Sequence, residues 1–207
     1  HYKNHQTMSI KERLTNILST LPEGVKLVAV SKFHPAERLQ EAYDAGQRIF
    51  GESRPQEMAA KQAVLPSDIE WHMIGHLQTN KVKTIAPFVT MISSVDSDRL
   101  IAEIERQAAK HNRTIEILLE VHVADEESKS GWSKEELYSY LSTGTLQTME
   151  HIRVRGLMTI ATNTDDEATI RRDFQHIRDI YHELKPMFGE MFDTLSIGMS
   201  DDYPIAL

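Results

Sequence analysis

The feature that most constrains this chain is a regular alternation of short apolar segments and amphipathic helical segments. The first apolar segment, 25–30, is rich in β-branched residues, and a helical pattern follows each apolar segment. Strands that alternate with helices in this way form parallel sheets with right-handed crossovers. The expected strands are 25–30, 48–50, 69–74, 89–93, 115–123, 154–160 and 194–197, and the expected helices are 9–21, 35–45, 56–65, 80–86, 98–111, 134–142 and 167–187.

This pattern is compatible with two folds, a doubly wound sheet and a closed barrel, and we favour the barrel. A TIM-type (β/α)8 barrel has eight strands in about 250 residues, whereas this chain of 207 residues ends where the next helix and strand are expected. If seven strands were the whole sheet, the first and the last would be open edges. We therefore expect an α/β fold of the TIM-barrel type whose eighth strand is missing from this chain. It would be a single domain over residues 8–207, with residues 1–7 a tag remnant or a disordered start.

Composition narrows the classes of function. The chain has no cysteine, which excludes disulfides, thiolate metal sites and cysteine nucleophiles and suits a reducing compartment. The formal net charge of -8 provides no basic surface for nucleic acid or anionic lipid. No apolar run reaches the roughly 18 residues that span a bilayer. These features predict a cytoplasmic protein with neither nucleic acid nor membrane as a partner.

Lys32 is the first candidate for chemistry, because it follows the expected strand 25–30 by two residues. That position is the carboxyl end of the strand, where barrels of this type place their active sites. An ammonium held among apolar neighbours loses hydration, so its pKa falls and the neutral amine can form a Schiff base with a carbonyl group. Position alone favours equally an ion pair between Lys32 and a carboxylate.

The segment Ser196–Ser200 is the second candidate, because it alternates small hydroxyl residues with glycine after the last expected strand. Such a composition suits a backbone cradle for phosphate, and the loops after the last two strands of these barrels are the usual phosphate site. Taken alone, a plain turn capped by Ser200 or Asp201 is the better interpretation. Together with Lys32, the segment predicts a ligand that carries both an aldehyde and a phosphate, which is pyridoxal 5′-phosphate.

Six sequence strings, spaced about one per β/α unit, resemble the pyridoxal phosphate homeostasis proteins, which share the barrel of the alanine racemase N-terminal domain. The resemblance covers almost the whole chain. The strings are AVSK (Ala29–Lys32), FGE followed by QE (Phe50–Glu57), WHMIGHLQTNK (Trp71–Lys81), ESKSG (Glu127–Gly131), RGLMTI (Arg155–Ile160) and LSIGMSDD (Leu195–Asp202).

The resemblance implies that Lys32 forms an aldimine with pyridoxal phosphate and that Ser196, Gly198, Met199 and Ser200 surround the phosphate. Met158 would pack near the pyridine ring, although a plain core methionine is an equally good interpretation. The resemblance also implies a monomeric carrier that buffers the cofactor or delivers it to apo-enzymes that need it, rather than a fast enzyme.

Two departures from the family pattern bear on cofactor affinity. The family's usual GEN is here Gly51, Glu52 and Ser53. The family's closing strand, with an arginine and a GT or GS pair, is absent. His72 and His76 have the spacing of a helical metal pair, but on a strand they would lie about 13 Å apart, so we expect no shared metal.

Two other functions compete with the carrier. An amino-acid racemase would use the same bond between the cofactor and Lys32 to acidify a substrate's α-proton. It would also need a second base, which alanine racemases take from an additional domain. A Schiff-base aldolase would use the lysine on a sugar phosphate instead.

Overall fold

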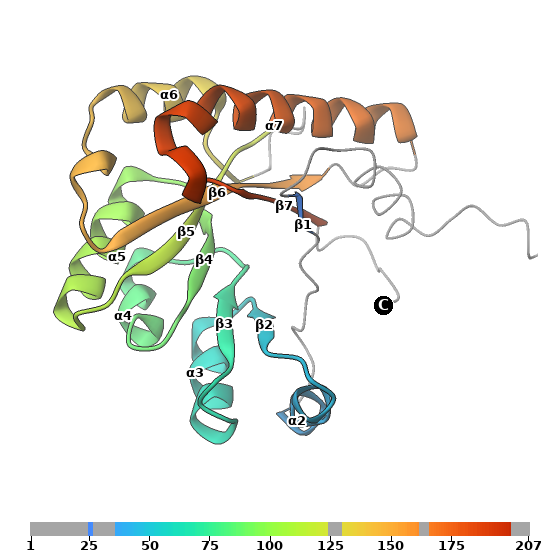
Figure 1. Cartoon of the computed structure of the whole chain (residues 1–207), viewed down its shortest axis with the longest axis vertical. Helices are drawn as coiled ribbons and strands as arrows, with labels where there is room; N and C mark the ends of the chain where they lie inside the picture. The colour runs from blue at the N-terminus through green and yellow to red at the C-terminus, as the bar shows by residue number, and fades with distance from the viewer. Residues whose placement is uncertain (1–24, 27–35, 124–129, 162–165, 200–207) are drawn as a thin grey trace, which may run out of the picture.

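The computed structural model describes residues 25–26, 36–123, 130–161 and 166–199. For residues 25, 26, 161, 198 and 199 only the backbone is considered. Within these ranges seven strands form one parallel sheet in the order β1-β7-β6-β5-β4-β3-β2. Helices cover one face of this sheet (Figure 1), as the alternation of apolar and helical segments predicts. The expected helix 9–21 and most of the expected strand 25–30 lie outside the described residues.

The elements follow the predicted order with small shifts at their ends. The strands are β1 (Val25–Lys26), β2 (Ile49–Glu52), β3 (Glu70–Met73), β4 (Met91–Val95), β5 (Ile115–Glu120), β6 (Ile152–Ala161) and β7 (Thr194–Met199). The helices are α2 (Ala36–Asp44), α3 (Pro55–Val64), α4 (Val82–Ile85), α5 (Asp98–Lys110), α6 (Lys134–Ser142) and α7 (Glu167–Phe188). Short 3₁₀ turns are η2 (Thr79–Lys81), η3 (Leu146–Thr148) and η4 (Gly189–Met191).

Some predicted elements differ from the structure in their limits or their type, and the expected strand 115–123 already ends at Glu120. The expected strand 89–93 begins at Met91 and ends at Val95, because the segment 89–95 mixes apolar residues with Thr90, Ser93 and Ser94 and contains no glycine or proline that would mark its ends. The expected helix 80–86 is a 3₁₀ turn followed by one turn of α-helix.

Side-chain caps fix where the longer helices begin. The hydroxyl of Ser97 accepts a hydrogen bond from the Leu100 backbone N–H at the start of α5. Ser133 and Glu136 form a reciprocal capping box at the start of α6. Because these bonds satisfy amide groups that a helix leaves unpaired, the start of α6 could be predicted to the residue.

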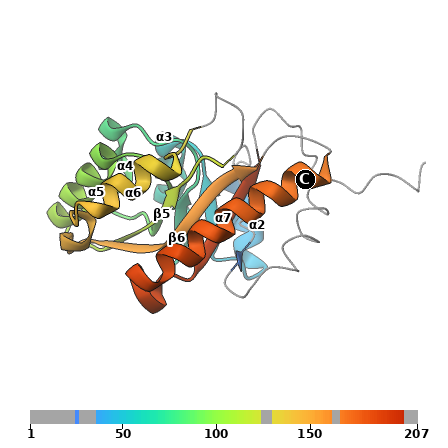
Figure 2. The same cartoon turned by 90° about the horizontal axis from the view of Figure 1, so that it is seen from above.

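The two faces of the sheet have different surroundings. Residues such as Ile117, Leu119 and Leu157 belong to the main hydrophobic core under the helices. In Figure 2, α4, α5 and α6 lie along one side of the sheet and α7 runs beside β6. On the opposite face Leu118 and Met158 form a smaller apolar cluster with Met91. This second face, away from the helices, is called the inner face below.

The last strand of the chain is not an open edge of the sheet. β7 is paired on both sides, with β6 and with β1, where Val25 lies opposite Leu195 and Lys26 opposite Ser196. Pairing with β1 satisfies backbone groups that an edge strand would expose. The first and last strands are therefore neighbours, and among the described strands β1 and β2 end the sheet.

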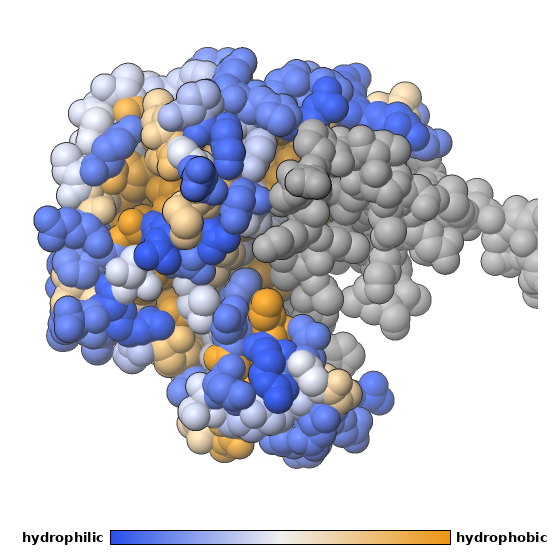
Figure 3. Space-filling view, viewed as in Figure 1, coloured by the Kyte–Doolittle hydropathy of each residue, from blue (hydrophilic) through white to orange (hydrophobic). Residues whose placement is uncertain are grey.

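The surface in Figure 3 is mainly hydrophilic, with hydrophobic residues showing in small areas between the polar ones. No helix in the described ranges is both long enough and apolar enough to cross a bilayer.

Candidate functional site

The structure places four of the six predicted ligand residues on two neighbouring strands. Met158 lies on β6, and Ser196, Gly198 and Met199 lie on β7. In the register of the two strands, Met158 pairs with Ser196 and Gly198 pairs with Ile160. Lys32 and Ser200 lie outside the described residues. The predicted segments RGLMTI and LSIGM therefore run side by side.

A row of three side chains crosses the inner face at one level. Glu120 on β5 pairs with Met158 on β6, and Met158 pairs with Ser196 on β7. Paired residues of parallel strands point to the same face, and neighbouring strands lie about 4.8 Å apart. Glu120 and Ser196 are thus about 10 Å apart, two strand spacings, with the methionine between them.

Met158 supplies apolar surface to this row. Its side chain is 5% exposed and clusters with Met91 and Leu118, against which Ile160 also packs. A flexible, polarisable thioether at this place can pack against an aromatic ring. The contacts are equally those of a core methionine, so its role in binding stays a prediction.

Glu120 is the buried polar residue of this row that the sequence analysis did not single out as a candidate. Its side chain is 2% exposed, and its Oε2 accepts a hydrogen bond of 2.7 Å from the Ser130 hydroxyl. Burial raises the pKa of Glu120, the hydrogen bond from Ser130 lowers it, and the negative charge of Asp96 raises it further. One signal was present: a charged residue ends the apolar run 117–119 and falls on the inner face by alternation.

The segment Ser130–Trp132 returns to the carboxyl end of β5 and holds Glu120 in place. Trp132 forms a parallel bridge with Val121, and its indole N–H donates to the carbonyl of Val95 at 3.0 Å. Gly131 has φ +118°, and a Cβ there would lie 2.9 Å from the backbone nitrogen of His122. Only glycine suits this position, which accounts for the glycine of the ESKSG string.

A second polar group lies after β4. The Asp96 carboxylate is 3.9 Å from Nδ1 of His76, whose side chain is 65% exposed. Burial raises the pKa of Asp96, and the nearby His76 lowers it. His72 faces Glu70 instead, at 3.8 Å. Among the described residues no group of three or more histidine and acidic side chains could hold a metal ion.

The ends of β2 and β3 carry the FGES sequence and the first glycine after β3. Glu52 is buried and pairs with Lys61 of α3 at 2.5 Å, so it ties β2 to a helix and does not face the row. A Cβ on Gly75 would lie 2.5 Å from the backbone oxygen of Ser53. The chain after β3 therefore packs against the residue that replaces the family's asparagine.

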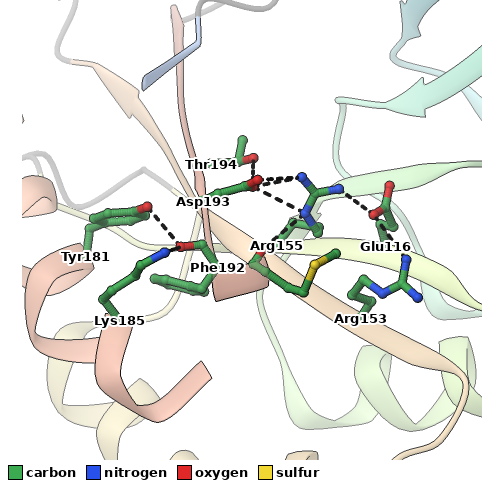
Figure 4. A network of polar contacts seen from close by, with 9 residues as sticks. Glu116, Arg153, Arg155, Tyr181, Lys185, Phe192, Asp193 and Thr194 are labelled. Carbon is green, nitrogen blue, oxygen red and sulfur yellow. Dashed lines mark hydrogen bonds and ion pairs between the residues drawn. The ribbon is translucent and has the colours of Figure 1, made fainter. Parts of the chain in front are cut away.

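The amino edge of the sheet, where its strands begin, carries a network of ion pairs around Arg155 (Figure 4). Its guanidinium donates to Glu116 at 2.5 Å and to both carboxylate oxygens of Asp193 at 2.8 and 2.9 Å. The Arg155 side chain also donates to the backbone oxygen of Met191. These bonds connect β5, β6 and the entry to β7.

A bulge positions this arginine. The register of β5 and β6 shifts so that Ile117 pairs with Val154 and Leu118 with Gly156, and Arg155 is skipped. A bulge of this kind re-aims the side chain of the extra residue. At the next position, a Cβ on Gly156 would lie 1.6 Å from the backbone oxygen of Thr194, so the strands approach too closely for any side chain.

Comparison with known proteins agrees with this architecture. The family model described as "Alanine racemase, N-terminal domain" matches residues 6–205. A pyridoxal phosphate homeostasis protein of Aquifex aeolicus is 36% identical over 97% of this chain and 92% of its own length. Its counterpart in Pasteurella multocida is 34% identical over 97% of this chain and 91% of its own length.

Solved structures extend the comparison to the fold. PipY of Synechococcus elongatus without PLP has a TM-score of 0.75 and is 34% identical, over 91% of this chain and 97% of PipY. PipY with PLP bound has a TM-score of 0.72 and is 33% identical, over 90% of this chain and 96% of PipY. The alanine racemase of Clostridium difficile has a TM-score of 0.61 at 13% identity, over 92% of this chain and 55% of that enzyme, and shows the fold alone.

The fold defines a parallel β/α protein of the barrel type, with the polar side chains of Glu120 and Ser196 on its inner face. The chain belongs to the alanine racemase N-terminal domain family and, within it, to the pyridoxal phosphate homeostasis proteins.

Proposed function

We propose that this chain binds pyridoxal 5′-phosphate on Lys32 and acts as a carrier in the intracellular homeostasis of that cofactor. The pairing of β1 with β7, in which Lys26 lies opposite Ser196, is the observation that carries the proposal. Because the two strands are parallel, their carboxyl ends lie at the same edge of the sheet, and Lys32 and Ser200 come after these two ends in the sequence. An amine and a phosphate cradle that follow two neighbouring strands in the sequence would match the two reactive ends of the cofactor.

The described residues fit this ligand. The apolar surface of Met158 suits a pyridine ring, and the hydroxyl of Ser196 makes no hydrogen bond within the described ranges, which leaves it available to a phosphate oxygen. Gly198 has no side chain that would keep an anion from its backbone N–H. A net charge of -8 makes such local donors necessary for an anionic ligand.

The chemistry supplied by the cofactor is a reversible condensation. Nζ of Lys32 would form a C=N bond with the aldehyde carbon, and one water molecule would leave. A carrier needs only this bond and its reversal by water or by another amine. The names of the relatives support a carrier, and PipY with PLP bound supports the choice of ligand.

The covalent part of the proposal is tested by colour and by reduction. Wild-type protein mixed with pyridoxal phosphate should become yellow, and borohydride should fix a pyridoxyl group to the peptide that contains Lys32. Lys32→Ala should stay colourless after removal of free cofactor. Lys83→Ala, which changes an exposed lysine of α4, should behave as the wild type. Stoichiometric labelling of Lys32→Ala would contradict the assignment.

The phosphate part is tested by comparing two ligands. Ser196→Ala should weaken binding of pyridoxal phosphate by about tenfold, the effect of one hydrogen bond to a charged group, because the lost hydroxyl contacts the phosphate. Pyridoxal, which lacks the phosphate, should bind both proteins equally. An equal loss for the two ligands would show that Ser196 does not contact the phosphate.

The carrier is separated from a racemase by turnover. Loaded protein should reactivate an apo-enzyme that depends on pyridoxal phosphate, and Lys32→Ala should not. Racemisation of alanine at about 1 s⁻¹ or faster, an ordinary enzyme rate, would replace the carrier by an enzyme. We propose that the protein works as a monomer in the cytoplasm, which its cysteine-free composition suits.

A further inference from the structure

We propose that Glu120 is a further ligand-binding residue, whose protonated carboxyl group donates a hydrogen bond to an acceptor on the pyridine ring of the bound cofactor. This inference rests on the proposed function and adds a third strand to the site. In this proposal, β5 contacts the side of the ligand that faces away from the phosphate.

Position is the first argument. Glu120, Met158 and Ser196 occupy paired positions on β5, β6 and β7, so the three side chains point to the inner face. With the phosphate at β7 and the ring over β6, the next side chain along the row is that of Glu120. The distance of about 10 Å across two strand spacings suits a ligand made of one ring and one phosphate group.

The state of the carboxyl group is the second argument. Glu120 is as buried as Glu52, but Glu52 has the ammonium of Lys61 at 2.5 Å. Among the described residues Glu120 has no cationic partner, and its Oε2 is held by the neutral Ser130. The other oxygen, Oε1, accepts no hydrogen bond within the described ranges. A buried ionised carboxylate without a cation is strongly disfavoured.

The surrounding charges also favour a proton on Glu120. Burial raises its pKa, the hydrogen bond from Ser130 lowers it, Asp96 raises it, and His76 lowers it. Asp96 and His76 are the titratable groups that act on Glu120 in the described part of the chain, and they are 3.9 Å from each other. A carboxylate beside an anionic ligand would repel it, whereas a neutral acid donates a hydrogen bond. A proton on Glu120 would therefore avoid a buried charge in the fold and provide a hydrogen-bond donor for the ligand.

The test compares three variants of the full chain in titrations with pyridoxal phosphate from pH 5.5 to 9. Glu120→Leu, which keeps the volume but has no donor, should weaken binding by about tenfold and shift the absorbance maximum of the bound cofactor. Glu120→Gln keeps a donor and should recover most of the affinity. The affinity of wild type relative to Glu120→Gln should fall as the pH rises, because only the wild-type group ionises.

Glu116→Gln is the matched control, since Glu116 lies on the same strand and the same face but at the other edge. It should leave the affinity, the spectrum and the pH profile as in the wild type. Titrations with cofactor analogues methylated at the ring nitrogen or at the phenolic oxygen then identify the acceptor: the one that Glu120 contacts is the one whose methylation removes the difference between wild type and Glu120→Leu.

The outcomes separate this inference from the proposed function. If Glu120→Leu binds pyridoxal phosphate with wild-type affinity, spectrum and pH profile, the role of Glu120 is refuted while the carrier function stands. If the wild type itself binds no cofactor, both fail. Should Glu120→Leu not fold, the pH profile of Glu120→Gln decides, because a profile parallel to that of the wild type refutes the proposal.

Discussion

The inner face of β5 carries two glutamates, Glu116 and Glu120, which differ in their burial and in the side chains that donate hydrogen bonds to them. Glu116 lies at the amino edge and is paired with Arg155 at 2.5 Å, with Arg153 at 3.8 Å on its other side. Glu120 lies at the carboxyl edge, is buried, and has a neutral serine as its hydrogen-bond donor. The same residue type thus appears once beside two arginines and once, among the described residues, buried without a cationic partner.

The two glutamates illustrate a difference in charge pairing between the amino edge and the carboxyl edge of the sheet. At the amino edge, burial lowers the pKa of Arg155, but the bonds to Glu116 and Asp193 outweigh burial and raise it overall. Opposite charges are satisfied there, which supports stability. At the carboxyl edge burial raises the pKa of both Glu120 and Asp96. Groups with shifted pKa values are common at functional sites, which agrees with the proposal that the ligand binds at the carboxyl edge, where barrels of this type have their active sites.

The largest expected effect comes from Gly156→Ala, at the point where β6 and β7 meet. The new Cβ would lie 1.6 Å from the backbone oxygen of Thr194, and two central strands would have to separate. We expect a loss of more than about 4 kcal/mol, in the range of severe substitutions, measured by urea denaturation or seen as insoluble protein. Gly144→Ala is the control: Gly144 also has a positive φ, of +74°, but open space around it, so only about 1 kcal/mol of backbone strain is expected.

The next effect separates the two edges directly. Arg155→Met would leave Glu116 and Asp193 without their main cation, at a cost of about 3 kcal/mol for breaking a largely buried pair. Arg153→Met is the control, because Arg153 is half exposed and lies 3.8 Å from Glu116; such a surface pair contributes less than about 1 kcal/mol. The affinity of folded Arg155→Met for pyridoxal phosphate should stay within about twofold of wild type. A tenfold loss would show that the two edges are coupled.

A smaller effect is expected from Thr159→Val near the carboxyl edge. The buried Thr159 hydroxyl donates to the backbone oxygen of Val121 at 2.7 Å, next to Glu120. Removing it should cost about 1–2 kcal/mol, the usual result of leaving a buried group unpaired. In contrast to Arg155→Met, it should also weaken cofactor binding, because the end of β5 is no longer held. The exposed Thr148 offers the control Thr148→Val, for which both measurements should stay near the wild type.

Much of this fold could be predicted from the sequence because its signals are local. Periodicity identified the strands and helices, and the caps at Ser97 and Ser133 fixed where α5 and α6 begin. The position of Ser196, Gly198 and Met199 on a strand beside Met158 agrees with the predicted order of elements, while their role in binding stays a prediction. The strand limits at β4 were missed because the segment 89–95 contains no glycine or proline and mixes apolar with hydroxyl residues, so nothing local marks its ends.

What could not be predicted depends on register. The pairing of β1 with β7 joins residues some 170 positions apart, and no local pattern announces it. Glu120 was missed for the same reason: only the pairing with Met158, and of Met158 with Ser196, reveals that it belongs to the row. The bulge at Arg155 is a further case, because it moves a residue out of the alternation on which the prediction was based.

The smallest expected effect is a pH dependence of stability, which has opposite signs in two glutamates. The pKa of Glu120 is raised in the folded chain above its ordinary value of 4.5. Folding therefore binds this proton more tightly, and the resulting stability is present below pH 4.5 and lost as the pH rises through the folded-state pKa. Glu103 is the counterpart, since hydrogen bonds from Arg106 and Gln107 lower its pKa, so that its stabilisation is present above pH 4.5 and lost toward acid.

Urea denaturation of the cofactor-free chain between pH 4 and 8 measures how the free energy of unfolding depends on pH for both glutamates. Relative to wild type, Glu120→Gln should gain stability as the pH rises, because it avoids the cost of ionising a buried acid. Glu103→Gln should show the reverse slope, and a shallower one, because its group is close to solvent and screened. Parallel curves for wild type and Glu120→Gln would mean that Glu120 is ionised without cost. An ionised Glu120 at the carboxyl edge would then cost the folded chain no more stability than the paired Glu116 at the amino edge.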